Sequence, residues 1–108
     1  MPKKILSTGA VPTLVQERLT IWGQCIRKQR ITQNLQASDL CARMGISDAT
    51  LRRLEKGDPG AGAGIFLTAL LVLGILDLAV PVPDEQLWAA DTRQRVRRTA
   101  PGDDDAEF

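Results

Sequence analysis

One short stretch constrains the fold of this chain more than any other: residues 36–57, which read QASDLCARMGISDATLRRLEKG. Its first half has apolar residues at helical spacing up to Gly45, and glycine commonly ends a helix because it adopts the left-handed conformation without a steric penalty. Two residues later, Ser47 is a good N-cap for a second helix that runs to Lys56. Two short helices joined by so tight a turn predict a helix-turn-helix motif.

The second helix of this motif has a composition that suits contact with another molecule. Leu51 and Leu54 lie three residues apart and make one apolar face, so the other face is free. In a helix-turn-helix, this helix enters the major groove of DNA, and its first turn comes close to the base edges. Asp48 is expected to accept a hydrogen bond from a cytosine amino group. Small or short polar side chains fit such a place, and the predicted base contacts are Ser47, Asp48, Ala49, Thr50 and Arg53.

Basic side chains and helix amides around the motif predict contacts with the DNA backbone. The amino-terminal end of the first motif helix presents free backbone N–H groups and the positive end of the helix dipole to a phosphate. Arg52 and Lys56 are four residues apart and share one stripe of the second helix. The predicted phosphate contacts are Arg27, Lys28, Gln36, Ala37, Ser38, Arg52 and Lys56.

The segments on either side of the motif also have helical patterns. The loop DPGAGAG leads into a hydrophobic helix expected over residues 64–73. Residues 75–82 fit either a last helical turn or a short strand, and residues 83–98 fit one more helix. A long helix is expected over residues 12–30, with these side chains on its inner face: Leu14, Leu19, Trp22 and Ile26.

These patterns together predict an all-α domain of four or five helices, with a C-terminal dimerisation segment. The helix-turn-helix domain is expected to be flanked by a tail at each end. The parts are a flexible N-terminal arm (1–11), the helix-turn-helix domain (12–82, motif 36–57), a helical and basic extension (83–100) and a disordered acidic tail (101–108).

Charge is distributed unevenly along the chain. The formal net charge is +1, but residues 1–100 hold all 14 Lys and Arg and nine of the 13 Asp and Glu, a net charge of +5. The other four acids lie in residues 101–108. An acidic tail therefore masks a basic domain, which favours nucleic acid as a partner. The run RQRVRR, residues 93–98, is either a solvated helix end or a second contact with DNA or a partner.

Several classes of protein are disfavoured by the composition. Histidine, the usual general base near neutral pH, is absent, so we do not expect an enzyme or a cofactor. Cys25 and Cys41 fit buried hydrophobic positions and, without histidine, do not complete a zinc site, so no metal is expected. No secretory signal and no uninterrupted apolar span of about 20 residues is seen, which predicts a cytoplasmic protein without membrane contact.

Residues 19–57 resemble the lambda-repressor/Cro class of helix-turn-helix, the XRE family. In that family an arginine late in the first helix pairs with a glutamate near the end of the third, and Arg30 and Glu55 match this pair. Gly45 matches the turn glycine and Leu51 a buried aliphatic residue. The resemblance implies a lambda-repressor-like fold and DNA-binding regulation of transcription.

Two positions depart from the family pattern. Cys41 stands where the family most often has alanine, and a small residue there still permits close helix packing. Ala37 stands where the family often has a glutamine that contacts DNA, so one customary contact is missing.

The sequence beyond the motif is similar to HipB-type antitoxins, which are encoded beside HipA-type kinases. This resemblance implies a homodimer that represses its own operon and binds a kinase toxin. Two alternatives remain open: a module that acts mainly by sequestering a partner kinase, and a phage-type repressor with no toxin partner. The segment ILDLAVPV is more apolar than a monomer would leave exposed, and the expected dimer contacts are Ile75, Leu76, Leu78, Val80, Val82 and Trp88.

Overall fold

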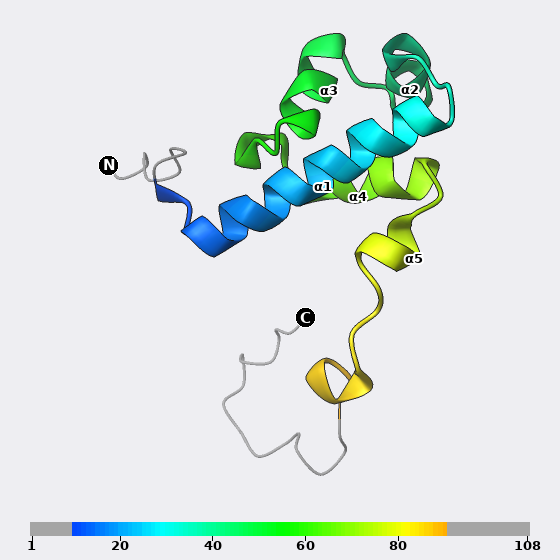
Figure 1. Cartoon of the computed structure of the whole chain (residues 1–108). Helices are drawn as coiled ribbons and strands as arrows, with labels where there is room; N and C mark the ends of the chain where they lie inside the picture. Colours follow the sequence, from blue (N-terminus) through cyan, green and yellow to red (C-terminus); the bar gives the residue numbers. More distant parts are fainter. Residues whose placement is uncertain (1–9, 91–108) are drawn as a thin grey trace, which may run out of the picture.

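The computed structural model describes residues 10–90, and every regular element within them is helical. This confirms the all-α fold class. Figure 1 shows the long helix α1 lying across α3 and α4, with α5 at the opposite end of the molecule from α2 and α3. The helices are α1 (Thr13–Thr32), α2 (Ala37–Met44), α3 (Asp48–Glu55), α4 (Ala63–Val72) and α5 (Leu76–Ala79), with single 3-10 turns at Pro59–Ala61 and Glu85–Leu87.

The turn between α2 and α3 forms as its residue types predict. Gly45 adopts the left-handed conformation with φ of 72°, and its N–H donates to Cys41 O at 2.8 Å. Ser47 then caps α3, because its hydroxyl oxygen accepts from the Thr50 N–H at 3.1 Å. A residue with a Cβ would find the Gly45 conformation strained, whereas glycine does not.

The core lies between α1, α3 and α4, with α2 closing one end. Five large side chains in it are fully buried, and Trp22 on α1 packs against one of them, Phe66, with ring centroids 5.7 Å apart. Leu51 and Leu54 are both buried, so the apolar face of α3 points inward and its other face is left to solvent. The fully buried set is Ile26, Leu40, Leu54, Phe66 and Leu70.

Two expectations about the ends of the domain were wrong. Leu14 was placed on the inner face of α1 but is 62% exposed, because helical geometry puts it on the opposite side of α1 from Gln16, Leu19 and Thr20, which are partly buried. Residues 83–90 form a single 3-10 turn, not the start of a helix, and all of them are exposed. With no face to bury, this segment lacks the packing that stabilises a short helix.

Residues 75–82, for which helix and strand were both open, contain the helical turn α5. Parts of the expected arm, of the basic extension with its RQRVRR run, and the whole acidic tail lie outside the described residues. No helix among those described has the length and apolar character needed to cross a membrane.

The close approach of α1 to the end of α3 depends on Gly23. A Cβ at this position would lie 2.5 Å from Leu54 O and 2.7 Å from Glu55 O, far inside contact distance. We expect Gly23→Ala to lower the free energy of unfolding by about 1 to 3 kcal/mol, the usual cost of overpacking, as measured by urea denaturation.

Gly64→Ala is the matched control for this substitution. Gly64 lies in α4, and a Cβ there would meet nothing within 4 Å, so alanine is expected to be neutral or to stabilise by about 0.5 to 1 kcal/mol. Equal stabilities for the two variants would contradict the close contact between α1 and α3.

Candidate nucleic-acid interface

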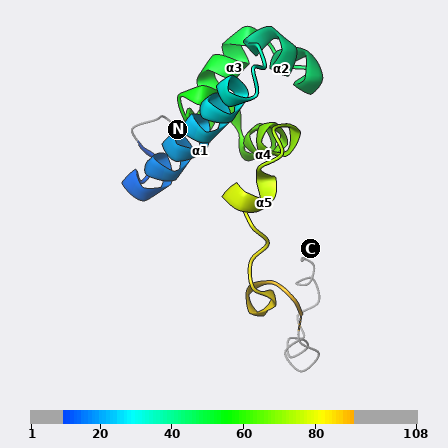
Figure 2. The ribbon, with the colours of Figure 1, turned by 45° about the vertical axis from the view of Figure 1, so that its right-hand side comes forward.

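Helices α2 and α3 form one end of the molecule, and both views show them on the far side of α1 and α4 from α5 (Figures 1 and 2). Of the predicted base contacts, Thr50 is half-buried and the others are exposed. Arg52 and Lys56, predicted to contact phosphates, are exposed on α3 as well. The free face of α3 thus carries the side chains that the sequence assigned to DNA.

An ion pair joins α1 to the carboxyl end of α3. Arg30 Nε lies 2.8 Å from Glu55 Oε2, and Arg30 Nη2 lies 3.4 Å from Glu55 Oε1. The two side chains are only 14% and 11% exposed, so solvent screens them weakly. The hydrogen bonds that Arg30 donates to Glu55 raise the pKa of Arg30 above its ordinary value. Charge-assisted, two-point contacts of this type also fix geometry, so the pair sets how α3 lies on α1.

The same arginine reaches the connection to α2. Its Nη1 donates to Leu35 O at 3.3 Å, in the loop just before α2. Arg27 adds a longer contact, with its Nη1 4.0 Å from Glu55 Oε1. One cluster of charges therefore fixes both helices of the motif relative to α1.

A groove of about 450 Å³ runs between the end of α1, the start of α2 and α3. Gln36, the N-cap residue of α2, makes no side-chain cap to the helix amides, which leaves the N–H groups of the first turn available to a phosphate. Five of the predicted phosphate contacts, Arg27, Gln36, Ala37, Ser38 and Arg52, line this groove together with Arg30, Asp48, Leu51 and Glu55.

Two predicted phosphate contacts lie outside this groove. Lys28 lines different hollows of α1, one of which also contains Cys25 and Ile75 near α5. Lys56 is the C-cap residue of α3, at the end away from the turn. The structure therefore separates Lys28 in particular from the side chains on α3.

Cys41 makes a contact that the sequence did not predict. Its Sγ lies 3.4 Å from Asp48 Oδ1 and 3.6 Å from Ser47 O, so the thiol links α2 to the first turn of α3. Burial, with a smaller contribution from the bond to Asp48, raises the pKa of this thiol above its ordinary value. Protonated sulfur is a weak donor, and here its acceptor is a predicted base-contacting residue.

Arg53 also has a partner that the sequence did not reveal. Its Nε lies 3.1 Å from Asp58 Oδ2, and Asp58 Oδ1 accepts from the Gly60 N–H at 2.8 Å. The Gly60 amide, and then Arg53, lower the pKa of Asp58 below its ordinary value. Asp58 follows the end of α3 in a loop whose sequence carries no motif, so no pattern in the chain pointed to it.

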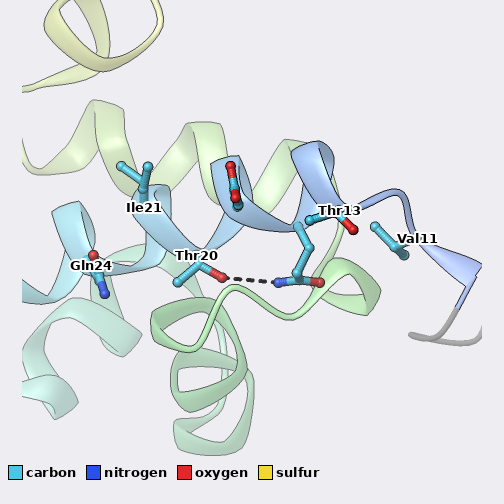
Figure 3. Close-up of a pocket in the computed structure, with 7 residues that line it drawn as sticks. Val11, Thr13, Thr20, Ile21 and Gln24 are labelled. Atoms are coloured by element: carbon cyan, nitrogen blue, oxygen red, sulfur yellow. Dashed lines mark hydrogen bonds between the residues drawn. The ribbon is translucent and has the colours of Figure 1, made fainter.

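A further hollow, of about 590 Å³, lies along the start of α1 (Figure 3). Gln16 donates from Nε2 to Thr20 Oγ1 at 3.2 Å and to Gly57 O at 2.9 Å, which ties α1 to the end of α3. Val11, Thr13 and Ile21 line the hollow with Gln24 and Glu17. Its lining has no basic side chain, so it lacks the charge that a nucleic-acid contact requires.

The expected dimer contacts divide into two groups. Leu78, Val82 and Trp88 are exposed, Leu78 by 83%, and the Trp88 indole N–H donates to Pro83 O at 2.9 Å. The other three are half-buried against the core of the same chain: Ile75, Leu76 and Val80. Only the side chains of the first group are exposed enough to contact a second molecule over most of their surface.

The environment of Cys41 predicts low thiol reactivity. The thiolate is the reactive species, and a raised pKa together with burial lowers both its population and its accessibility at pH 7 to 8. In a Cys25→Ala variant, Cys41 is expected to react with an aromatic disulfide reagent far more slowly than in the same variant unfolded in urea. A native-state rate close to the unfolded rate would refute the buried contact.

Residues 26–75 match a family model described as helix-turn-helix. The match begins within α1 and covers α2, the turn, α3 and α4. A search of curated proteins and a search of solved structures found no match.

Proposed function

We propose that this protein, whose residues 26–75 match a family model described as helix-turn-helix, is a DNA-binding regulator of the lambda-repressor/Cro type. It represses its own operon by binding a nearly palindromic operator as a homodimer. The observation that carries the proposal is the free face of α3. That face presents small residues on its first turn and arginines on the next, while the opposite face is buried. Such a helix fits the major groove, where the first residues contact base edges.

Among the proposed base contacts, Asp48 and Arg53 have the most capacity left for DNA. The hydroxyl groups of Ser47 and Thr50 are already hydrogen-bonded to each other at 3.1 Å, so they have less hydrogen-bonding capacity left for a base. Asp48 has a second carboxylate oxygen for a cytosine amino group, and Arg53 has two terminal nitrogens for a guanine edge. Ala49 is suited to contact with a thymine methyl group.

The DNA backbone is proposed to lie over the groove at the start of α2. Arg27 and Arg52 line it beside the first-turn amides, a combination that attracts a phosphate through charge and through directed N–H groups. These contacts position the protein and give binding its salt dependence, whereas the side chains of α3 supply the sequence preference.

Dimerisation is proposed to occur through the end of the chain that follows α4. Leu78, Val82 and Trp88 are exposed apolar residues there, in α5 and the segment after it, and Figure 2 shows α5 on the opposite side of α1 and α4 from α3. Two-fold symmetry would place the two α3 helices one DNA turn, roughly 34 Å, apart.

The finer role is proposed from the resemblance to HipB-type antitoxins. It rests on ISDATLRRLEKGDPGAG and the apolar stretch after it, and it assigns a HipA-type kinase toxin as the protein partner. A module that acts mainly by sequestering that kinase, and a phage-type repressor without a toxin, are the alternatives. Loss of operator binding on substitution of α3 would count against the first, and failure to bind a kinase encoded beside the gene would favour the second.

The main test is fluorescence anisotropy with the DNA upstream of the gene and with a scrambled duplex of equal length, at about 0.15 M salt. Specific binding is expected to be at least about 10³-fold tighter than non-specific binding. Arg53→Ala is expected to cost about 1 to 3 kcal/mol and to change the base preference. Equal weak binding to both duplexes would contradict operator recognition.

Arg52→Ala and Lys28→Ala make a matched pair for the backbone contacts. Arg52→Ala is expected to weaken binding to all sequences alike and to reduce the salt slope by about 1. Because Lys28 lies outside the groove, Lys28→Ala is expected to have a smaller effect. The reverse order would place the phosphate path along α1 and not over the groove.

Charge at Leu78 tests the dimer. Since Leu78 is exposed and packs on little of its own chain, Leu78→Asp is expected to leave the fold intact and to give monomers by light scattering. Leu14→Asp, at another exposed leucine, in α1, is the control and should leave the mass unchanged. Val80 is less suitable because it packs on the core. A dimer that persists in Leu78→Asp would refute this interface.

A further inference from the structure

Asp58 lies at the junction between α3 and the following 3-10 turn, and it is held on two sides. One carboxylate oxygen caps the turn at Pro59–Ala61 by accepting from Gly60 N, and the other accepts from Arg53 Nε. The backbone adds a third link, because Asp58 N donates to Arg53 O at 3.0 Å. Backbone contacts therefore hold the Asp58 carboxylate in place independently of its contact with the Arg53 side chain.

This contact occupies only one nitrogen of the Arg53 guanidinium. Nε donates to Asp58, while Nη1 and Nη2 make no hydrogen bond to any residue in the range 10–90. A guanine edge presents two acceptors, O6 and N7, which a guanidinium binds through two N–H groups. The side chain thus retains the donors that base recognition needs.

Gly60 limits where the guanidinium lies. A Cβ at Gly60 would be 2.9 Å from Arg53 Nη2, so the arginine packs against the glycine itself. Arginine otherwise has many rotamers, and holding one of them in advance reduces the entropy lost on binding. Asp58 and Gly60 together restrict a side chain that is still 48% exposed.

The opposite charges of Arg53 and Asp58 also affect base-specific and non-specific DNA binding differently. Arg53 and Asp58 are of opposite sign, so together they add little attraction to the phosphate backbone, which governs non-specific binding. A guanine edge, by contrast, is recognised through directed hydrogen bonds at short range. The pair is therefore suited to base discrimination more than to attraction.

We infer that Asp58 is a positioning residue for base recognition, which holds Arg53 so that its terminal nitrogens face a guanine of the operator. This inference rests on the proposed function, in which α3 lies in the major groove. It adds a residue outside the two-helix motif (36–57), in the loop after α3, to those that determine the preferred sequence.

The test compares four forms of the full chain: wild type, Arg53→Ala, Asp58→Asn and Gly60→Ala. The Asn side chain keeps an oxygen for the Gly60 N–H but loses the charge that holds Arg53, and the added methyl at Gly60 displaces the guanidinium without changing any charge. Circular dichroism and thermal unfolding check that each variant is folded. Anisotropy then gives the Kd for the operator, for its single-base variants and for a scrambled duplex.

Arg53→Ala first identifies the guanine, as the base pair whose preference it relaxes. A good two-point contact gives about 5- to 150-fold discrimination, and Asp58→Asn and Gly60→Ala are each expected to lose about fivefold or more of it at that base pair alone. Binding to the scrambled duplex is expected to stay the same or to tighten slightly in Asp58→Asn, because a negative charge is removed. A role limited to folding would not produce this pattern.

Two results would overturn the inference while leaving the proposed function intact. One is wild-type discrimination at that guanine in both Asp58→Asn and Gly60→Ala. The other is tighter operator binding by Asp58→Asn with discrimination retained, which would make Asp58 a competitor of DNA for Arg53. A wild-type protein that does not distinguish operator from scrambled duplex would instead refute the proposed function itself.

Discussion

The contact of α1 with the carboxyl end of α3 determines where the candidate DNA-binding side chains lie. Gly23 lets the two helices approach, and the ion pair of Arg30 with Glu55 fixes their angle at one side. Gln16 adds a hydrogen bond to Gly57 O, one residue beyond the C-cap of α3. Because the loop before α2 is bonded to the same arginine through Leu35 O, the position of α1 fixes both the turn between α2 and α3 and the free face of α3.

Carboxylates pair with two arginines beside the free face of α3, Arg30 and Arg53. Glu55 neutralises Arg30 inside the fold, and Asp58 partly neutralises Arg53 outside it. Arg52 is left with no ion pair among residues 10–90 and is therefore suited to phosphate attraction. Under the proposed function, Arg30 thus has a structural role, Arg53 recognises a base and Arg52 attracts a phosphate.

Much of the fold followed from local chemistry that a sequence displays directly. Gly45 and Ser47 define the turn through their own backbone and capping preferences, and Leu51 with Leu54 defines the buried face of α3. The contacts of Cys41 with Asp48 and of Asp58 with Arg53 were missed, because they depend on how helices and loops meet after packing. The expectation for Leu14 failed because it is five residues from Leu19, whereas residues on one face of a helix are three or four apart.

Helix α5 has only four residues, far below the length at which an isolated helix is stable in water. It persists because Ile75 and Leu76 rest on the core, while Leu78 on the same turn faces solvent. Such a turn is expected to open and close often without unfolding the rest of the domain. Any molecule that covers Leu78 also slows that opening, so the exchange of the Ala79 and Val80 amide protons with water would report occupancy of this surface.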